Sequence, residues 1–202
     1  CHLCDAAAAA LSLWEDHTAP GVREWIADEL DMTPHAAGRF VAYLAGLHDI
    51  GKAIPGFQCQ DGADKIRHET ASYLTAPTLI DHPERVDPFT SGVAHRIGEI
   101  LGGHHGLYQP VDRRTRRPLR VPELGGPDWD AARRAIHTEL RSHLNPALPA
   151  RLPEPVAAVL TGLVIVADWI VSDTRWILED QWDAPTDVAA RWDHTLATTR
   201  DR

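Results

Sequence analysis

The feature that most constrains the fold is the adjacent pair His48-Asp49, which ends an apolar helical stripe within the segment Leu47-His48-Asp49-Ile50-Gly51-Lys52. Adjacent His and Asp residues mean little alone. Further histidines and a second aspartate are spread along the chain: His2, His68, the tandem His104-His105, and Asp168 at the end of an apolar run. Imidazoles and carboxylates used together typically bind metal ions. If these residues act together, the fold must bring five distant segments to one point.

Hydrophobic residues recur at helical spacing along most of the chain, and the sequence predicts an all-α fold with no strand of consequence. One helix is expected to begin at Pro34; His48 continues its apolar stripe and is therefore expected to face the core. The other expected helices cover residues 6–14, 22–30, 65–75, 90–101, 129–144, 156–176 and 186–199. The proline-rich segments 107–127 and 145–155 are expected to be a loop and a linker.

Asp168 follows the apolar run from Val156 to Ala167, which is too short for a membrane span and is typical of a buried central helix. A carboxylate inside such a helix is costly unless it is paired or binds a cation. The structural alternative is an ion pair with a buried Arg or Lys. The histidines elsewhere favour the metal-binding interpretation.

Composition limits the class of protein. The 202 residues, 44% of them hydrophobic, suit one helical domain, and the first residue is not Met, so a piece of a longer protein is expected. Three cysteines form no disulfide framework, which favours a location in the reducing cytoplasm. Cys1-His2-Leu3-Cys4 has the spacing of a zinc knuckle, but no second cysteine pair follows to complete a tetrahedral zinc site. A net charge of −9 argues against a broad phosphate-binding surface but not against a local, metal-centred one.

The ligand set suggests a particular chemistry. Histidine and carboxylate ligands without thiolates suit Zn, Mn, Fe, Co or Ni. Two such ions about 3.5–4 Å apart can bridge a hydroxide and clamp both oxygens of a phosphoryl displacement. Asp49 is the natural bridging ligand, because His48 leaves the same helix end about 100° around the axis. Lys52, one turn further on, could bind a substrate phosphate, and Glu69 and Ser72 could orient ligands.

The remaining histidines are given no role in this chemistry. Those expected at the surface are His17, His35, His82, His137, His143 and His194. His95, within the helix at 90–101, is left open.

The segments around these ligands resemble a known family. The Leu-His-Asp-Ile-Gly-Lys context is similar to the HD metal-dependent phosphohydrolase superfamily. Three further segments narrow the resemblance to the HD nuclease domain of the CRISPR type I effector helicase–nuclease, most closely its type I-E branch. These segments are Lys65-Ile66-Arg67-His68-Glu69 before Ser72, Gly103-His104-His105-Gly106, and Ala167-Asp168-Trp169-Ile170-Val171-Ser172-Asp173.

The resemblance implies a helical HD-domain bundle around two divalent transition-metal ions (Fe, Mn, Co or Ni) that cleaves single-stranded DNA by metal-bridged hydroxide attack. One ion would be held by His2, His48, Asp49 and Asp168, and the other by Asp49, His68, His104 and His105; Asp49 and Lys52 are the expected catalytic residues. Residues 1–180 would form the nuclease domain. Residues 181–202 would form a C-terminal helix or the start of a linker toward a helicase part.

The resemblance also implies partners. They are single-stranded DNA, a CRISPR RNA-guided targeting complex, and a helicase part in cis or in trans; a membrane is not expected. The chain has no Gly-x-x-x-x-Gly-Lys-Ser/Thr phosphate loop, so no ATP site is predicted in it.

Three alternatives stay open at this stage. An HD-family phosphohydrolase acting on nucleotides or cyclic dinucleotides would need a closed pocket, whereas a nuclease needs an open groove. In a non-enzymatic recruitment module, the metals would only hold the fold together. The run Arg113–Arg117 could follow a single-stranded backbone or could be a solvated loop.

Metal binding by these histidines is expected to depend on pH. Imidazoles bind metal only when neutral, so metal affinity should fall below about pH 6.5. Metal-dependent cleavage that is as fast at pH 5 as at pH 7.5 would contradict a histidine-rich site.

Overall fold

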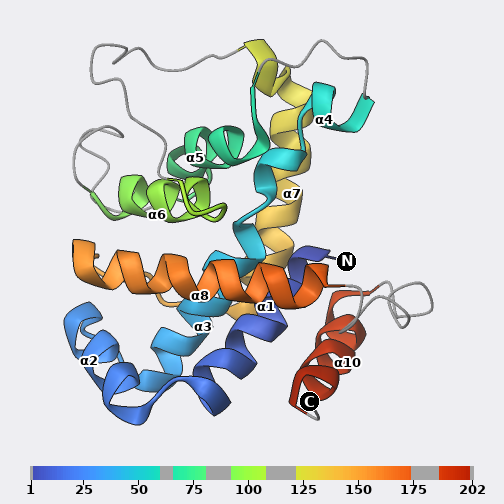
Figure 1. The fold of residues 1–202 in the computed structure, drawn as a ribbon. Coiled ribbons are helices and arrows are strands. Elements are labelled where there is room, and N and C mark those ends of the chain that lie inside the picture. The colour runs from blue at the N-terminus through green and yellow to red at the C-terminus, as the bar shows by residue number, and fades with distance from the viewer. Residues whose placement is uncertain (1, 60–65, 81–91, 108–121, 174–186, 201–202) are drawn as a thin grey trace.

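The computed structural model describes residues 2–59, 66–80, 92–107, 122–173 and 187–200, and all regular structure in these ranges is helical (Figure 1). This confirms the all-α prediction. The α-helices are α1 (His2–Ser12), α2 (Pro20–Leu30), α3 (Pro34–Leu47), α4 (Pro55–Cys59), α5 (His68–Leu79), α6 (Val93–Gly102), α7 (Pro127–Leu144), α8 (Glu154–Ser172) and α10 (Val188–Arg200). Shorter turns are the π-helical η1 (Leu13–His17) and the 3-10 helices η2 (Ile50–Lys52) and η3 (Pro122–Leu124).

The central element of the bundle is α3. Every residue from Phe40 through Ile50 is buried, and α3 contacts α1, α2, α6, α7 and α8. A helix that is apolar on all sides is stable only when other elements surround it. Thr33 caps its first turn by accepting a hydrogen bond from the Ala36 backbone N–H. Because α3 is fixed from all sides, its C-terminal end is a rigid place from which to present His48 and Asp49.

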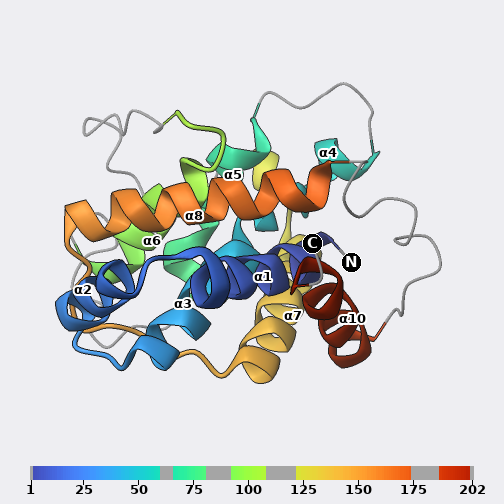
Figure 2. The same cartoon turned by 60° about the horizontal axis from the view of Figure 1, so that its bottom comes forward.

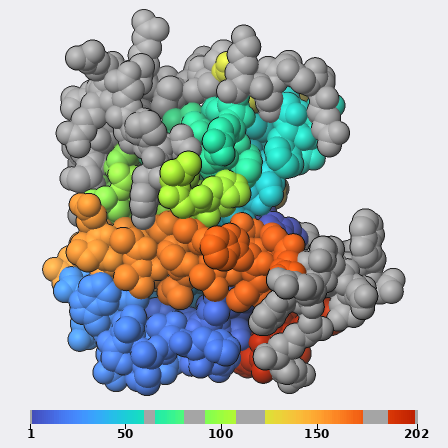
Figure 3. All heavy atoms as spheres, in the orientation of Figure 1, coloured from blue at the N-terminus to red at the C-terminus, as the bar shows by residue number. Residues whose placement is uncertain are grey.

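The prediction of a buried central helix at 156–176 holds for only one face of that helix. One face of α8 packs on α1, α3 and α6, whereas its residues Val159, Val166 and Trp169 are exposed. The helix forms the orange strip across the middle of Figure 3. The apolar run was predicted to be too short for a membrane span, but the 19 residues of α8 are long and apolar enough for one, the one such helix among the described residues. Its packing contacts and the buried Asp168 are those of a helix within a folded domain.

Several helix ends differ from the prediction. The first helix begins at His2 and therefore contains that histidine, and α8 begins at Glu154, with Pro155 in its first turn, and ends at Ser172. The predicted linker at 145–155 is accordingly shorter. The arginine run 113–117, His82 and Trp176 lie outside the described residues.

Helix α7 packs across α3 and corrects the surface prediction for one histidine. His137 is buried, and its Nε2 lies 2.7 Å from the Tyr43 hydroxyl on α3. Arg133, also buried, donates to the backbone oxygens of Ala53 and Leu124 at 2.7 and 2.9 Å. A buried guanidinium can satisfy several carbonyl groups at once, so it fixes the chain that follows η2.

Helices α5 and α6 approach closely because α6 presents glycines to Tyr73 of α5. A Cβ atom on Gly98 would lie 2.9 Å from the Tyr73 backbone oxygen, and one on Gly102 would lie 2.9 Å from the Tyr73 Cβ. Helix α5 starts with His68, and α6 ends just before His104-His105. The glycine contacts therefore set the distance between these histidines.

Replacing Gly98 by alanine should force α5 and α6 apart and lower the free energy of unfolding by about 1–3 kcal/mol. The matched control is Gly162→Ala on α8, where an added Cβ meets nothing within 4 Å. That change should stabilise the helix by about 0.5–1 kcal/mol. Urea denaturation of both variants tests the pair, and an equal effect of the two would contradict the close packing.

Candidate metal centre

The His48-Asp49 pair lies at the junction of α3 and η2, where a tight contact with α5 fixes the backbone. The Ser72 hydroxyl donates to the His48 backbone oxygen (2.7 Å) and accepts from the Gly51 N–H (2.9 Å). A Cβ on Gly51 would lie 2.0 Å from the His68 backbone oxygen, so only glycine fits here. Ser72 thus fixes the backbone of the pair, rather than orienting a ligand side chain as predicted.

The first cluster consists of His2, His48, Asp49 and Asp168. His2 Nε2 lies 3.4 Å from Asp49 Oδ2 and 3.2 Å from Asp168 Oδ1, and His48 Nε2 lies 3.3 Å from each of the same oxygens. Two ligand atoms about 2.1 Å from one cation lie about 3.0–3.4 Å apart. The cluster has the spacing that one transition-metal ion needs.

The second cluster consists of His68, His104 and His105. His68 Nε2 lies 2.9 Å from His105 Nε2, and the other oxygen of Asp49, Oδ1, lies 3.3 Å from His68 Nε2 and 3.5 Å from His104 Nε2. The two Asp49 oxygens therefore face different clusters. This is the geometry of a bridging carboxylate.

Unpartnered buried atoms show that these residues suit a cation. His48 and His104 each place Nδ1 against the backbone oxygen three residues earlier, Ala45 at 2.6 Å and Leu101 at 2.5 Å. Such bonds hold a proton on Nδ1, so Nε2 is the nitrogen that faces the cluster and that would bind a metal in the neutral imidazole. Within the described residues His48 Nε2, His104 Nε2 and Asp49 Oδ1 are buried without a hydrogen-bond partner.

The charges of the site follow from burial and from the close contacts. Burial opposes ionisation of Asp49 and Asp168, but contacts with the surrounding imidazoles outweigh it and hold both carboxyl pKa values well below the usual range. Burial lowers the pKa of His48, but Asp168 and Asp49 outweigh it and raise that pKa to about 9. Burial lowers the pKa of His68 to about 4. Two carboxylates are thus ionised, and His68 is neutral.

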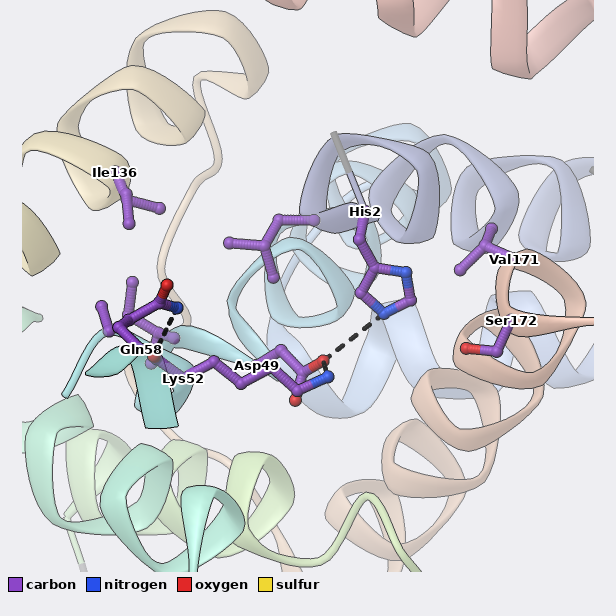
Figure 4. A pocket seen from close by; sticks show the side chains of 10 residues that line it. His2, Asp49, Lys52, Gln58, Ile136, Val171 and Ser172 are labelled. Carbon is purple, nitrogen blue, oxygen red and sulfur yellow. Dashed lines mark hydrogen bonds and ion pairs between the residues drawn. The ribbon is translucent and has the colours of Figure 1, made fainter. Parts of the chain in front are cut away.

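Beside the first cluster lies a cavity of about 460 Å³ (Figure 4). The Lys52 ammonium contacts Asp49 Oδ2 at its edge, and Gln58 Nε2 donates to the Lys52 backbone oxygen at 2.9 Å. On the other side Ser172 donates to Asp168 Oδ1 at 3.1 Å. The rest of the wall is largely apolar, formed by Leu3, Ile50, Ala53, Ile136 and Val171. An anionic group with an apolar portion would suit such a cavity.

All seven predicted metal ligands and Lys52 lie around this centre. Glu69 is buried, and its Oε2 lies 3.5 Å from His68 Nδ1 without a hydrogen-bond partner, so its role in orienting this histidine stays a prediction. His95 lies apart from both clusters, near Tyr73 and Glu99. The sequence did not reveal Gln58 or Ile136 as cavity residues, because they carry no local motif.

The helical fold and the two histidine clusters joined by one aspartate define the HD class of metal-binding domains, and comparisons with known proteins narrow the class. A family model described as the HD domain of Cas3 matches residues 1–177. The CRISPR-associated endonuclease/helicase Cas3 of Thermus thermophilus is 30% identical over 193 residues, which cover 85% of this chain and 20% of that protein.

Two solved structures extend the likeness to the fold. The Thermus thermophilus cas3 HD domain, crystallised in the presence of Ni²⁺, has a TM-score of 0.74 at 29% identity, with 99% of this chain and 80% of that chain covered. A chain in a CRISPR RNA-guided surveillance complex, described as pre-nicking, has a TM-score of 0.83 at 34% identity, with 100% and 26% covered.

This chain belongs to the Cas3 HD domain family. It spans about a fifth of the length of the Thermus thermophilus relative. The resemblance inferred from the ligand motifs is confirmed at the level of the family, whereas the type I-E branch and the ligand roles stay predictions.

The shared aspartate gives a prediction for metal stoichiometry. Asp49→Ala should lose both ions, Asp168→Ala only the ion of the first cluster, and His105→Ala only that of the second. Each affinity should fall more than about a hundredfold, since loss of a ligand's supporting partner alone costs about 10–100-fold. Mn²⁺ titration calorimetry and metal analysis after dialysis measure this, with the exposed Asp28→Ala as control. Identical losses in Asp168→Ala and His105→Ala would contradict two separate sites.

Proposed function

We propose that this domain is a metal-dependent nuclease that cleaves single-stranded DNA during CRISPR interference. The observation that carries the proposal is Asp49, whose two carboxylate oxygens face separate histidine clusters beside a cavity. Two divalent cations held there would activate water and neutralise charge on a scissile phosphate. The proposed ligands are His2, His48, Asp49 and Asp168 for one ion, and Asp49, His68, His104 and His105 for the other; Fe, Mn, Co and Ni are the candidates.

The walls of the cavity support a nucleic-acid substrate. Leu3, Ile136 and Val171 offer an apolar surface for a sugar or a base, while Lys52 and Gln58 lie at its polar edge. A volume of about 460 Å³ is in the range of sites for one small ligand and suits a single nucleotide unit. A DNA duplex would have to be unwound before one nucleotide unit of it could enter this cavity. This favours single-stranded DNA as the substrate.

Lys52 is the proposed phosphate-binding residue. Its ammonium contacts Asp49 Oδ2, an oxygen that also faces His2 and His48. The flexible Lys52 side chain can turn from this carboxylate to an oxygen of a bound phosphate, because both lie at the edge of the same cavity. It would then stabilise the negative charge that develops during hydrolysis.

The proposed partners follow from the relatives. The Thermus thermophilus protein is named an endonuclease/helicase, and this chain corresponds to about a fifth of it. A helicase part, in cis or in trans, would supply the single strand, and an RNA-guided surveillance complex would deliver the target. The acidic net charge of −9 fits such delivery, since broad electrostatic attraction to DNA is not expected.

A cleavage assay with metal add-back tests the proposal. The metal-free domain is supplied in turn with Mn²⁺, Co²⁺, Ni²⁺ and Fe²⁺ and given matched single-stranded and duplex DNA. Wild type and Asp28→Ala should cut the single strand, whereas Asp49→Ala should be inactive with an unchanged circular-dichroism spectrum. Lys52→Gln should lower the rate by about 10–100-fold, the loss of one charge-assisted hydrogen bond.

Three outcomes would count against this function. Absence of cleavage with all four metals would refute it. Unfolding of Asp49→Ala would favour the recruitment module, and hydrolysis of nucleotides or cyclic dinucleotides without DNA cleavage would favour the phosphohydrolase.

A further inference from the structure

Helix α10 lies beyond the part of the chain that the family model matches, yet it packs along α1 (Figure 2). The contact centres on a buried ion pair between Asp5 of α1 and Arg191 of α10. Arg191 Nε donates to Asp5 Oδ1 at 2.6 Å and Nη2 to Asp5 Oδ2 at 2.7 Å; the Thr195 hydroxyl also donates to Asp5 Oδ1 at 2.8 Å. All three residues are buried.

This pair holds a defined geometry. Two parallel N–H···O bonds between a planar guanidinium and a carboxylate fix both the separation and the orientation of the groups. The Cys4 thiol, next to Asp5, lies 3.5 Å from the Val188 backbone oxygen of α10, with Cys4 as donor. Two consecutive residues in the first turn of α1 are therefore attached to α10.

The same turn carries His2, three residues before Asp5 and so on the same side of the helix. The first turn of a helix is the part that frays, because its N–H groups have no partners within the helix. His2 is also the most exposed ligand of the first cluster: its side chain is 33% exposed, against 0, 3 and 11% for His48, Asp49 and Asp168. His2 therefore depends most on the position of its helix.

We infer that Arg191 is a positioning residue for the metal centre: through Asp5 it fixes the first turn of α1 and so places His2 against Asp49 and Asp168. The inference rests on the proposed metal site. It makes α10 part of the functional domain, although α10 lies beyond residues 1–177, which the family model matches. Its contribution is specific to the first cluster, because the second cluster comes from α5 and the end of α6, which do not carry Asp5.

Metal binding by site-selective variants tests this. His105→Ala isolates the first cluster and Asp168→Ala the second, and Arg191→Met is added to each. Mn²⁺ calorimetry should show an affinity loss of about 10–100-fold for the first cluster, as is typical when the partner of a ligand is removed, and less than about threefold for the second. The matched control, Arg200→Ala, removes the contacts of Arg200 with Glu15 and Asp16 at the other end of α10, and should change neither affinity.

Milder variants cover the case in which Arg191→Met does not fold. Arg191→Lys keeps the charge without the two parallel bonds, and Thr195→Val keeps the ion pair but removes one hydrogen bond. Both should weaken the first cluster selectively, with Arg191→Lys showing the larger loss. In a His2→Ala background, Arg191→Met should cause no further loss of Mn²⁺ affinity.

Equal losses at both clusters, or unchanged affinities together with a lower melting temperature, would overturn the inference and leave α10 a purely stabilising element. The proposed nuclease function can fail separately. A wild-type domain that binds two Mn²⁺ ions with the expected Arg191 dependence but cuts no DNA would refute the function and retain the positioning role.

Discussion

The structure depends on the burial of one carboxylate, Asp49, among the imidazole of the adjacent His48 and imidazoles from three other parts of the chain. An isolated buried charge is very costly, so this arrangement requires compensating positive charge at a defined point. With Lys52 as the one ammonium in contact with Asp49 among the described residues, the surrounding histidine nitrogens are placed to share cations with it. The convergence of α1, α3, α5, α6 and α8 follows from that requirement.

The two clusters that share Asp49 are built differently. The first is formed by buried side chains of the α3–η2 junction and of α8, with His2 as its partly exposed member; the second includes His105, which is exposed just beyond the end of α6. The pKa values of their histidines also differ, since Asp168 and Asp49 raise the pKa of His48 to about 9, whereas burial lowers the pKa of His68 to about 4. Near neutral pH, an ion that binds to the first cluster would thus have to displace a proton from His48, whereas His68 in the second cluster is already neutral.

Much of the site could be predicted because its ligands carry strong local signals. The tandem histidine after two glycines, the adjacent His48-Asp49 pair and a carboxylate after an apolar run are each visible within a few residues. The contacts that align them are not local. Gly51 must be glycine because of the backbone of α5, and Ser72 bonds to the His48 carbonyl, a pairing across 24 residues. Periodicity within one segment contains no information about such contacts.

The errors in the fold have the same origin. His137 lies on a mixed helix face, and its burial depends on the hydroxyl of Tyr43, which is 94 residues away in sequence. The apolar sequence of α8 predicts a buried central helix, but burial is decided by how many neighbours the bundle provides, and α3 occupies the centre instead. The positions of the helices were therefore predicted more successfully than the burial of the side chains on them.

The separation in sequence of the groups around His2 has a consequence for synthesis. Asp5 and Arg191 are 186 residues apart, and Asp168 likewise follows most of the chain. At about 5–20 residues per second, a ribosome needs roughly 10–40 s between them. For most of that interval the nascent chain lacks Asp168, and until its end it lacks the complete helix α10 that holds α1. The first cluster, which needs Asp168, and the α10 contact that holds α1 therefore form only after most of the domain has been synthesised.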